Sequence, residues 1–184
     1  MGCEMDSDYY DGNYGRDKKY HAHYKDSKYL TIFNVAKGML SEIKNPQILD
    51  LGCGSGQFAH MLWDSGYLCY SGVDFSKEAL GIAQGLSPQV FEWADIREYQ
   101  PNWDNFNVVV ILEVLEHLNE DRELIVKIPA GKHIIFSVPS FDDEAHVRTF
   151  RNKPQVHERY DDLIDISEIV PYMHWMICKG VRRG

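Results

Sequence analysis

A glycine-rich loop constrains this 184-residue chain more than any other feature. It reads Asp50-Leu51-Gly52-Cys53-Gly54-Ser55-Gly56 and lies between a short apolar run and a helical pattern over residues 57–64. Glycines there permit positive φ and leave out the β-carbon, so a ligand can touch the backbone beside the free N–H groups of the following helix. The spacing is G-x-G-x-G rather than the dinucleotide-binding G-x-G-x-x-G, and the absence of a following Gly-Lys-Ser/Thr excludes a P-loop. Taken alone, the cluster predicts either a ligand site or a tight turn.

Short apolar runs alternate with helical patterns along most of the chain, which is typical of a parallel sheet with helices on both faces. The strongest run, residues 108–112, suits a parallel strand that is buried on both sides. Strands are expected at residues 48–51, 68–73, 90–93, 106–112, 133–138, 166–170 and 172–181, and helices at 26–43, 57–64, 76–86, 114–124 and 154–163. The last two strands are joined too closely for a crossover helix, so they should form a hairpin. The predicted fold class is α/β, with a Rossmann-like, doubly wound, mostly parallel seven-stranded sheet and an antiparallel C-terminal hairpin strand.

The length predicts a single domain in residues 1–184, with three parts. Residues 1–26 hold five of the eleven tyrosines and few aliphatic residues. Such a segment cannot form its own core, so we expect either a disordered tail or a lid that packs on the rest of the protein, and we favour the lid. Residues 27–44 are expected to form an N-terminal helix and residues 47–184 the α/β core. Tyr14 and Tyr20 are the tyrosines that we expect to line a pocket.

Two acidic residues follow the second and third predicted strands. Asp74 lies 18 positions after Gly56, near the spacing expected of an acid that accepts ribose hydroxyls. Asp95 follows Trp93 and can accept from an adenine amino group. Each residue also has a plainer interpretation, a helix cap for Asp74 and a turn-initiating residue for Asp95. With the glycine loop, they place a ligand crevice at the carboxyl ends of the strands.

Four segments together resemble class I S-adenosylmethionine-dependent methyltransferases, in the same order and spacing. They are residues 48–56, 73–76, 94–96 and 110–118, and the resemblance covers about residues 47–138. It implies S-adenosyl-L-methionine as the cofactor and S-adenosyl-L-homocysteine as the product. The cofactor-binding residues that it implies are Asp50, Gly52, Gly54, Gly56, Asp74, Phe75, Asp95, Ile96 and Leu112. By family analogy, the glycine loop lies against the methionine part of S-adenosyl-L-methionine, Asp74 binds its ribose hydroxyls, and Phe75, Asp95 and Ile96 surround its adenine.

The candidate catalytic residues follow the fourth and fifth strands. Methyl transfer to a hydroxyl often needs a base, and His117, Glu113 and His146 are the candidates. A helix over residues 114–124 would place Glu113, Glu116 and His117 in one first turn, with Glu113 facing both partners. Two interpretations compete. In the first, the acids cap the helix and suit its dipole. In the second, they bind a divalent metal with His117, as in some O-methyltransferase and small-RNA 2′-O-methyltransferase relatives, and residues 142–146, which end in His146, could supply the further ligand that those RNA enzymes carry after the fifth strand. Because Leu118 replaces the second histidine of that motif, we expect no metal.

Composition argues against two classes of partner, nucleic acids and membranes. The chain has 19 basic and 28 acidic residues, a net charge of -9, which disfavours a nucleic-acid partner. No apolar run approaches 18 residues and no signal peptide is seen, so we expect no membrane partner and a cytoplasmic location. Arg148, after the fifth strand, is expected to clamp an anionic substrate group or to pair with a nearby acid.

The expected function is an enzyme that methylates oxygen or nitrogen of a small-molecule acceptor, with a homodimer as one possible assembly. The first alternative is a metal-dependent O-methyltransferase, of the RNA 2′-O or quinone type, that uses Glu113, Glu116 and His117. The second alternative is a non-methylating protein that binds S-adenosylmethionine, because fold does not imply reaction.

Overall fold

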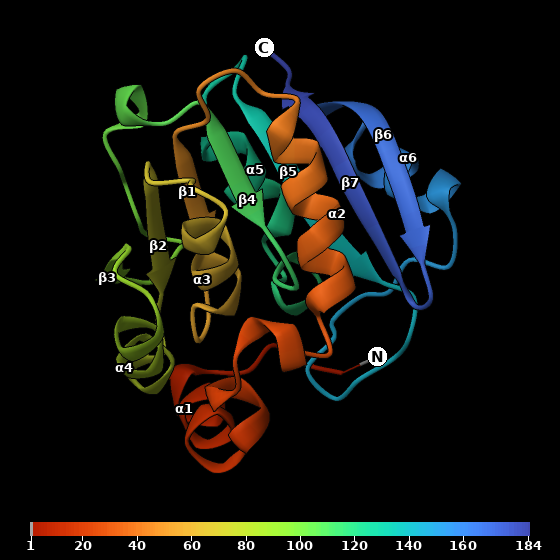
Figure 1. Ribbon diagram of the computed structural model, residues 1–184. Helices are drawn as coiled ribbons and strands as arrows, with labels where there is room; N and C mark the ends of the chain where they lie inside the picture. Colours follow the sequence, from red (N-terminus) through yellow and green to blue (C-terminus); the bar gives the residue numbers. More distant parts are fainter. Residues whose placement is uncertain (1) are drawn as a thin grey trace.

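A seven-stranded mixed sheet forms the centre of the computed structural model, which describes residues 2–184 (Figure 1). The strands are β1 (Ile48–Leu51), β2 (Tyr70–Asp74), β3 (Val90–Trp93), β4 (Val108–Ile111), β5 (His133–Pro139), β6 (Ile164–Tyr172) and β7 (Trp175–Arg182). Their order in the sheet is β3-β2-β1-β4-β5-β7-β6. Strands β1 to β5 run parallel, and β7 pairs antiparallel with both β5 and β6. The α/β class, the seven strands and the antiparallel C-terminal hairpin are confirmed.

Helices cover both faces of this sheet. They are α1 (Ser7–Arg16), α2 (Leu30–Ser41), α3 (Gln57–Asp64), α4 (Lys77–Leu86), α5 (Asp121–Lys127) and α6 (Lys153–Tyr160), with 3-10 turns η1 (Lys18–His21), η2 (Tyr24–Asp26), η3 (Trp103–Asn105) and η4 (Leu115–His117). In Figure 1, α2 and α3 lie in front of the sheet, and α5 and α6 lie behind it. The bounds of α3 match the sequence prediction, and Ser76 caps α4 as expected, since its hydroxyl accepts from Ala79 N–H at 3.1 Å.

The central strands are buried on both faces because their apolar residues alternate between two cores. In β4, Val109 and Ile111 belong to the core under α5 and α6, whereas Val108 and Val110 belong to the core under α2 and α3. All four are fully buried. This alternation explains why a continuous apolar run, rather than a period of two, marks β4 in the sequence.

The predicted helix over residues 114–124 is wrong. The chain forms the short turn η4 and then begins α5 at Asp121. Glu113 adopts a positive φ of 57°, which an α-helix excludes. The Arg148 guanidinium donates to the carbonyls of Leu115 and Leu118, and Val147 N–H donates to the Glu116 carbonyl. These carbonyls thus accept hydrogen bonds from residues distant in sequence, whereas in a continuous helix they would accept from backbone N–H groups one turn further along.

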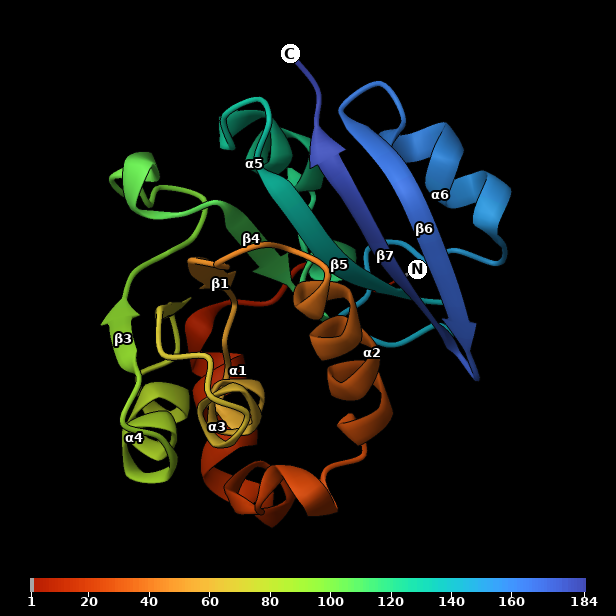
Figure 2. The same ribbon diagram turned by 45° about the horizontal axis from the view of Figure 1, so that its top comes forward.

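The tyrosine-rich N-terminal segment is ordered and packs on the core. Residues 2–26, called the lid below, contain α1, which packs against α4 at the carboxyl end of the parallel strands (Figure 2). The Asp6 side chain accepts from Tyr9 N–H at the start of α1, and Arg16 lies in its last turn. These are ordinary helix signals. Within residues 2–184, no helix has both the length and the apolarity that crossing a membrane requires.

Candidate functional site

Two adjoining cavities lie between the lid and the carboxyl edge of the sheet. The larger has a volume of about 330 Å³ and the smaller about 80 Å³. Both are lined by Tyr10, Tyr14, Gly52, Glu113 and His117. Because these residues are shared, the two cavities form one site with a narrow end and a wider end.

The glycine loop approaches the site through its backbone. Gly52, Gly54 and Gly56 all have positive φ, of 83°, 53° and 72°. A β-carbon on Gly52 would lie 2.4 Å from Val114 Cγ2, and one on Gly54 would lie 2.7 Å from the Tyr14 hydroxyl. The loop therefore has space only for backbone, because Val114 and Tyr14 occupy the positions that side chains on Gly52 and Gly54 would need. Gly52 and Gly54 line the site, whereas Gly56 begins α3 and packs against Ala83.

The Asp74 carboxylate is buried and accepts hydrogen bonds from two backbone N–H groups. It accepts from Gly54 N–H at 2.8 Å and from Ser76 N–H at 2.9 Å. Burial raises the pKa of Asp74 to about 6, and these backbone donors act in the opposite direction. The residue thus ties the glycine loop to the end of β2 and lines the smaller cavity. Asp50 lies beneath the loop, where burial raises its pKa to about 7 and the Tyr70 hydroxyl donates to it at 2.7 Å.

The smaller cavity has apolar walls and one charged corner. Phe75 and Ile96 line it, as the sequence prediction required, and Leu118 joins them. Asp95 also lines it, but Arg97 Nε donates to both Asp95 oxygens at 3.0 Å, and this contact lowers the pKa of Asp95. A ligand amino group at this corner would share Asp95 with Arg97.

The lid closes the site from above at several points. Tyr10 packs against the rings of Phe75 and His117, with centroids 5.4 and 5.8 Å away. Asp11 accepts from the Ser76 hydroxyl at 2.5 Å and from Glu78 N–H at 3.2 Å. Sequence reasoning did not identify Tyr10 or Asp11, because nothing marks them before α1 is known to be a helix.

The first residues of the lid extend over the charged corner. Glu4 accepts from Arg97 at 2.6 Å and from both the backbone and the side chain of Asn119 at 2.9 Å. Gly2 N–H donates to the His146 carbonyl at 2.9 Å. Both predicted pocket tyrosines, Tyr14 and Tyr20, line the larger cavity.

The Glu113 side chain is bound to β5 and β7. It accepts from the Ser137 hydroxyl at 2.7 Å and from Trp175 Nε1 at 2.6 Å, while its own N–H donates to Ser137. Burial raises the pKa of Glu113 to about 8. The expectation that Glu113, Glu116 and His117 share one helical turn is therefore wrong, because Glu113 lies before η4 and is bound to β5 and β7.

Glu116, His117 and His146 instead come together at the wider end. One ligand atom from each lies within 4.8 Å of the others. His117 Nδ1 lies 2.9 Å from the Ala145 carbonyl and His146 Nδ1 lies 3.1 Å from the Phe141 carbonyl, so each ring places its proton on Nδ1 and presents a bare Nε2. Burial lowers the pKa of both histidines, which keeps them neutral.

Glu116 is the unusual member of this group. It is fully buried, and neither carboxylate oxygen has a hydrogen-bond partner among residues 2–184. Burial raises its pKa to about 8. Arg148 does not clamp an open anion site or pair with the acids of residues 142–144. It binds the carbonyls of η4 and lies 3.2 Å from the buried Asp121 carboxylate.

Comparisons with known proteins agree with the fold. Residues 48–128 match a family model described as a methyltransferase domain. No curated protein sequence matches the chain.

Solved structures share the fold at low sequence identity. A magnesium protoporphyrin IX methyltransferase from Synechocystis, with bound S-adenosylmethionine, aligns with a TM-score of 0.69 and 18% identity over 99% of this chain and 100% of that one. The N-methyltransferase NodS from Bradyrhizobium japonicum, in complex with S-adenosylhomocysteine, aligns with a TM-score of 0.66 and 18% identity over 84% and 87%. A protein from Pyrococcus horikoshii aligns with a TM-score of 0.73 and 15% identity over 94% and 99%.

Proposed function

The chain carries the methyltransferase domain of the class I S-adenosylmethionine-dependent family, and we propose that it transfers the methyl group to an oxygen or nitrogen of a small-molecule acceptor. S-adenosylmethionine is its cofactor. The observation that carries the proposal is the closed site itself, in which a bare glycine loop, a buried aspartate and an aromatic lid surround one cavity system.

The residues fit this cofactor. In our proposal, Gly52 and Gly54 lie along its methionine part, supported from below by Asp50 and Gly56, and Leu112 contacts its amino group. Asp74 binds the ribose hydroxyls with the lone pairs that its two backbone donors leave free. Phe75, Ile96 and Asp95 hold the adenine in the smaller cavity. Bound there, the cofactor supplies an electrophilic sulfonium methyl.

The wider end of the site positions the acceptor and takes up its proton. His117 presents a bare, neutral Nε2 beside both cavities, so it suits the role of general base toward a hydroxyl or an ammonium. His146 stacks against it with ring centroids 4.9 Å apart. Glu113 fixes the side chains of Ser137 and Trp175 at this end of the site by accepting a hydrogen bond from each. The lid excludes water, which aligns the acceptor and strengthens these interactions.

The shape of the wider end supports a small acceptor. The larger cavity measures about 330 Å³, at the lower limit of ordinary small-molecule sites, and in our proposal it also holds the methionine part of the cofactor beside Gly54 and Leu112. The space that remains beside the aromatic rings of Tyr29, Phe33 and Phe141 therefore suits a small acceptor. A macromolecular acceptor would have to displace the lid, which is tied to the core by Glu4 and Asp11.

A metal-dependent O-methyltransferase is the second candidate, and Glu116 favours it. A fully buried carboxylate whose oxygens find no partner in residues 2–184 is costly unless a ligand completes it. Two histidines that present bare Nε2 atoms, each held by a backbone carbonyl, form the usual surroundings of a metal ion. The ligand set would be Glu116, His117 and His146, so His146 replaces the Glu113 of the sequence hypothesis.

Calorimetric titration with S-adenosylmethionine and S-adenosylhomocysteine tests the cofactor site first. We expect micromolar affinity for the wild type and at least a tenfold loss in Asp74→Ala, about 1.4 kcal/mol. Binding that Asp74→Ala leaves unchanged would refute the assigned site. Incubation with the cofactor alone, followed by chromatography, separates cleavage without an acceptor from methyl transfer.

Acceptor screening with and without EDTA then separates the two candidates. Activity that survives EDTA supports the metal-free base. Activity that EDTA abolishes and Mg²⁺ or Mn²⁺ restores, and that Glu116→Gln removes while cofactor affinity is retained, supports the metal-dependent reaction.

A further inference from the structure

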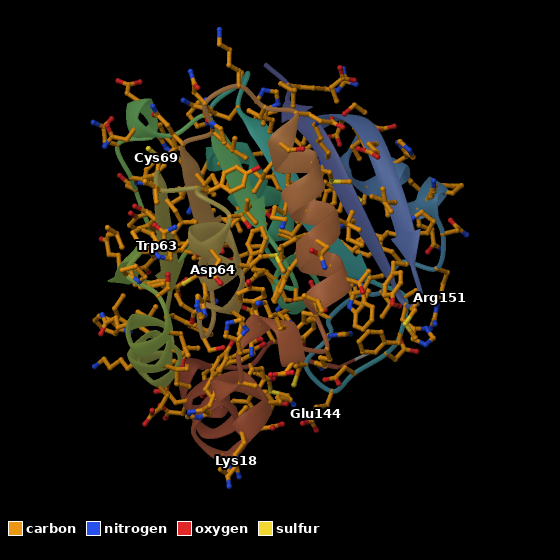
Figure 3. All side chains as sticks on the ribbon, viewed as in Figure 1. Lys18, Trp63, Asp64, Cys69, Glu144 and Arg151 are labelled. Atoms are coloured by element: carbon orange, nitrogen blue, oxygen red, sulfur yellow. The ribbon has the colours of Figure 1, made fainter. Side chains whose placement is uncertain are left out.

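A second group of metal-ligating side chains lies outside the methyl-transfer site. His60 and Asp64 occupy one face of α3, four residues apart, and His23 lies between η1 and η2 of the lid. Figure 3 shows Asp64 at α3, well away from Glu144 near the wider end of the site. One ligand atom from each of the three residues lies within 4.8 Å of the others.

The geometry of the group is close to that of a metal site. His60 Nε2 lies 3.8 Å from Asp64 Oδ1, too far for a hydrogen bond but near the separation of two ligands on one ion. The rings of His23 and His60 are in contact, with centroids 4.6 Å apart. Asp64 is exposed, so an ion can enter from solvent and keep water as a further ligand. Two imidazoles with one carboxylate suit Zn²⁺ or a similar transition-metal dication.

The His60 ring makes no hydrogen bond in the described part of the chain that metal binding would break. Its Nδ1 is buried and finds no hydrogen-bond partner in the described part of the chain. A lone pair is thus available without breaking a protein contact.

His23 gives up only one weak contact on coordination. Its Nδ1 accepts from Lys25 N–H at 3.2 Å, which is long for a hydrogen bond. The neighbouring Tyr24 hydroxyl donates to Asp64 Oδ2 at 2.9 Å and leaves Oδ1 for an ion. That bond holds the carboxylate in place, as an outer-shell partner does in metal sites.

We propose that His23, His60 and Asp64 bind a transition-metal dication that fixes the base of the lid to α3. The existing links here are few: Gln57 Nε2 donates to the carbonyls of Lys19 and Ala22 at 2.9 Å, and Tyr24 bonds to Asp64. A metal ion would add a strong link between residue 23 and the core. Since residues 2–22 cover the cofactor cavity, the ion slows opening of the lid and release of whatever lies beneath it.

The test titrates Zn²⁺ into metal-free protein by calorimetry, in a Glu116→Gln background that removes the other candidate cluster. We expect one Zn²⁺ per chain, and at least a tenfold weaker affinity when His23→Gln or Asp64→Asn is added. Lys25→Gln, which removes a nearby cation, should strengthen binding about threefold. No Zn²⁺ binding in the Glu116→Gln background, or an affinity that neither added substitution changes, would overturn the proposal.

A second measurement guards against misfolding. His23 lies at the surface between two 3-10 turns, so His23→Gln should keep the circular dichroism spectrum and the S-adenosylhomocysteine affinity of its parent. Zn²⁺ should slow tryptic cleavage at Lys18 and Lys19 in the Glu116→Gln protein but not in the protein that also carries His23→Gln. Equal protection in both would refute the link to the lid. Because the cofactor affinity is measured separately, failure of this site leaves the proposed methyl transfer untouched.

Discussion

The two ends of the site each contain a buried carboxylate, but the fold treats them differently. Asp74, at the end of the site that we propose for the cofactor, accepts two backbone N–H groups and ties the glycine loop to β2. Glu116, at the acceptor end, is fully buried and finds no hydrogen-bond partner in residues 2–184. The cofactor end is therefore completed by the protein, whereas the acceptor end depends on a proton or a ligand. Three predictions test this difference.

The largest effect is expected at the cofactor end, from Gly52→Ala. The new methyl group would meet Val114 Cγ2 at 2.4 Å, at a φ of 83° that alanine tolerates poorly. We expect a loss of about 2–3 kcal/mol in unfolding free energy and at least a thirtyfold weaker affinity for S-adenosylhomocysteine. Gly38→Ala in α2 is the matched control, because no atom lies near its β-carbon and alanine favours a helix by about 0.5–1 kcal/mol. Urea denaturation and calorimetry measure both; equal behaviour of the two variants would contradict the assigned role of the loop.

An isosteric amide at each carboxylate should have opposite effects. The pKa of Glu116 is about 8 in the folded protein against an ordinary 4.5, so the native state holds a proton that the unfolded chain has lost. Stability should then fall as the pH rises from about 4.5 to 8. In metal-free protein, Glu116→Gln should raise the unfolding free energy by about 2 kcal/mol at pH 8 and hardly at pH 4.5.

Asp74→Asn is the counterpart at the cofactor end. Its amide would bring an N–H group against Gly54 N–H or Ser76 N–H. Because the pKa of Asp74 is also raised, to about 6, removal of its buried charge offsets part of this cost, and we expect a net loss of about 1 kcal/mol at pH 8. Thermal unfolding across pH measures both variants. A destabilised Glu116→Gln at pH 8, without metal, would show that Glu116 has a partner in solution.

The smallest effect is expected where the lid meets α4. Asp11→Ala removes the acceptor for the Ser76 hydroxyl and Glu78 N–H, near the cofactor end. We expect cofactor affinity to fall about threefold to fivefold, mainly through faster release, since a partly exposed contact contributes little. Asp8→Ala makes the same charge change at an exposed position of α1. Stopped-flow kinetics measures the rate of cofactor release from both variants. Identical release rates would show that Asp11 does not help to hold the lid closed.

The cofactor end was largely predictable because its signals are local. The β1-loop-α3 unit, the Ser76 cap and the strand-end positions of Asp74 and Asp95 follow from neighbouring residues. The sequence did not predict α1, although Asp6 and Arg16 mark its ends. Its many tyrosines do not form the spacing of apolar residues that indicates a helix. At the other end of the site the predicted helix over residues 114–124 was wrong, because Arg148, thirty or more residues further along the chain, donates to the carbonyls of Leu115 and Leu118.

The sequence by itself determined the α/β class, the position of the glycine loop and the match of residues 48–128 to a methyltransferase domain, because these depend on contacts between near neighbours in the chain. Only the tertiary structure decided that Glu113 turns toward Ser137 and Trp175 and that His23 meets α3. It also decided that His146, rather than an acid of residues 142–144, lies beside Glu116 and His117. These arrangements join segments far apart in sequence. Their geometry is set by strand order and by burial of charge, and no local pattern encodes either one.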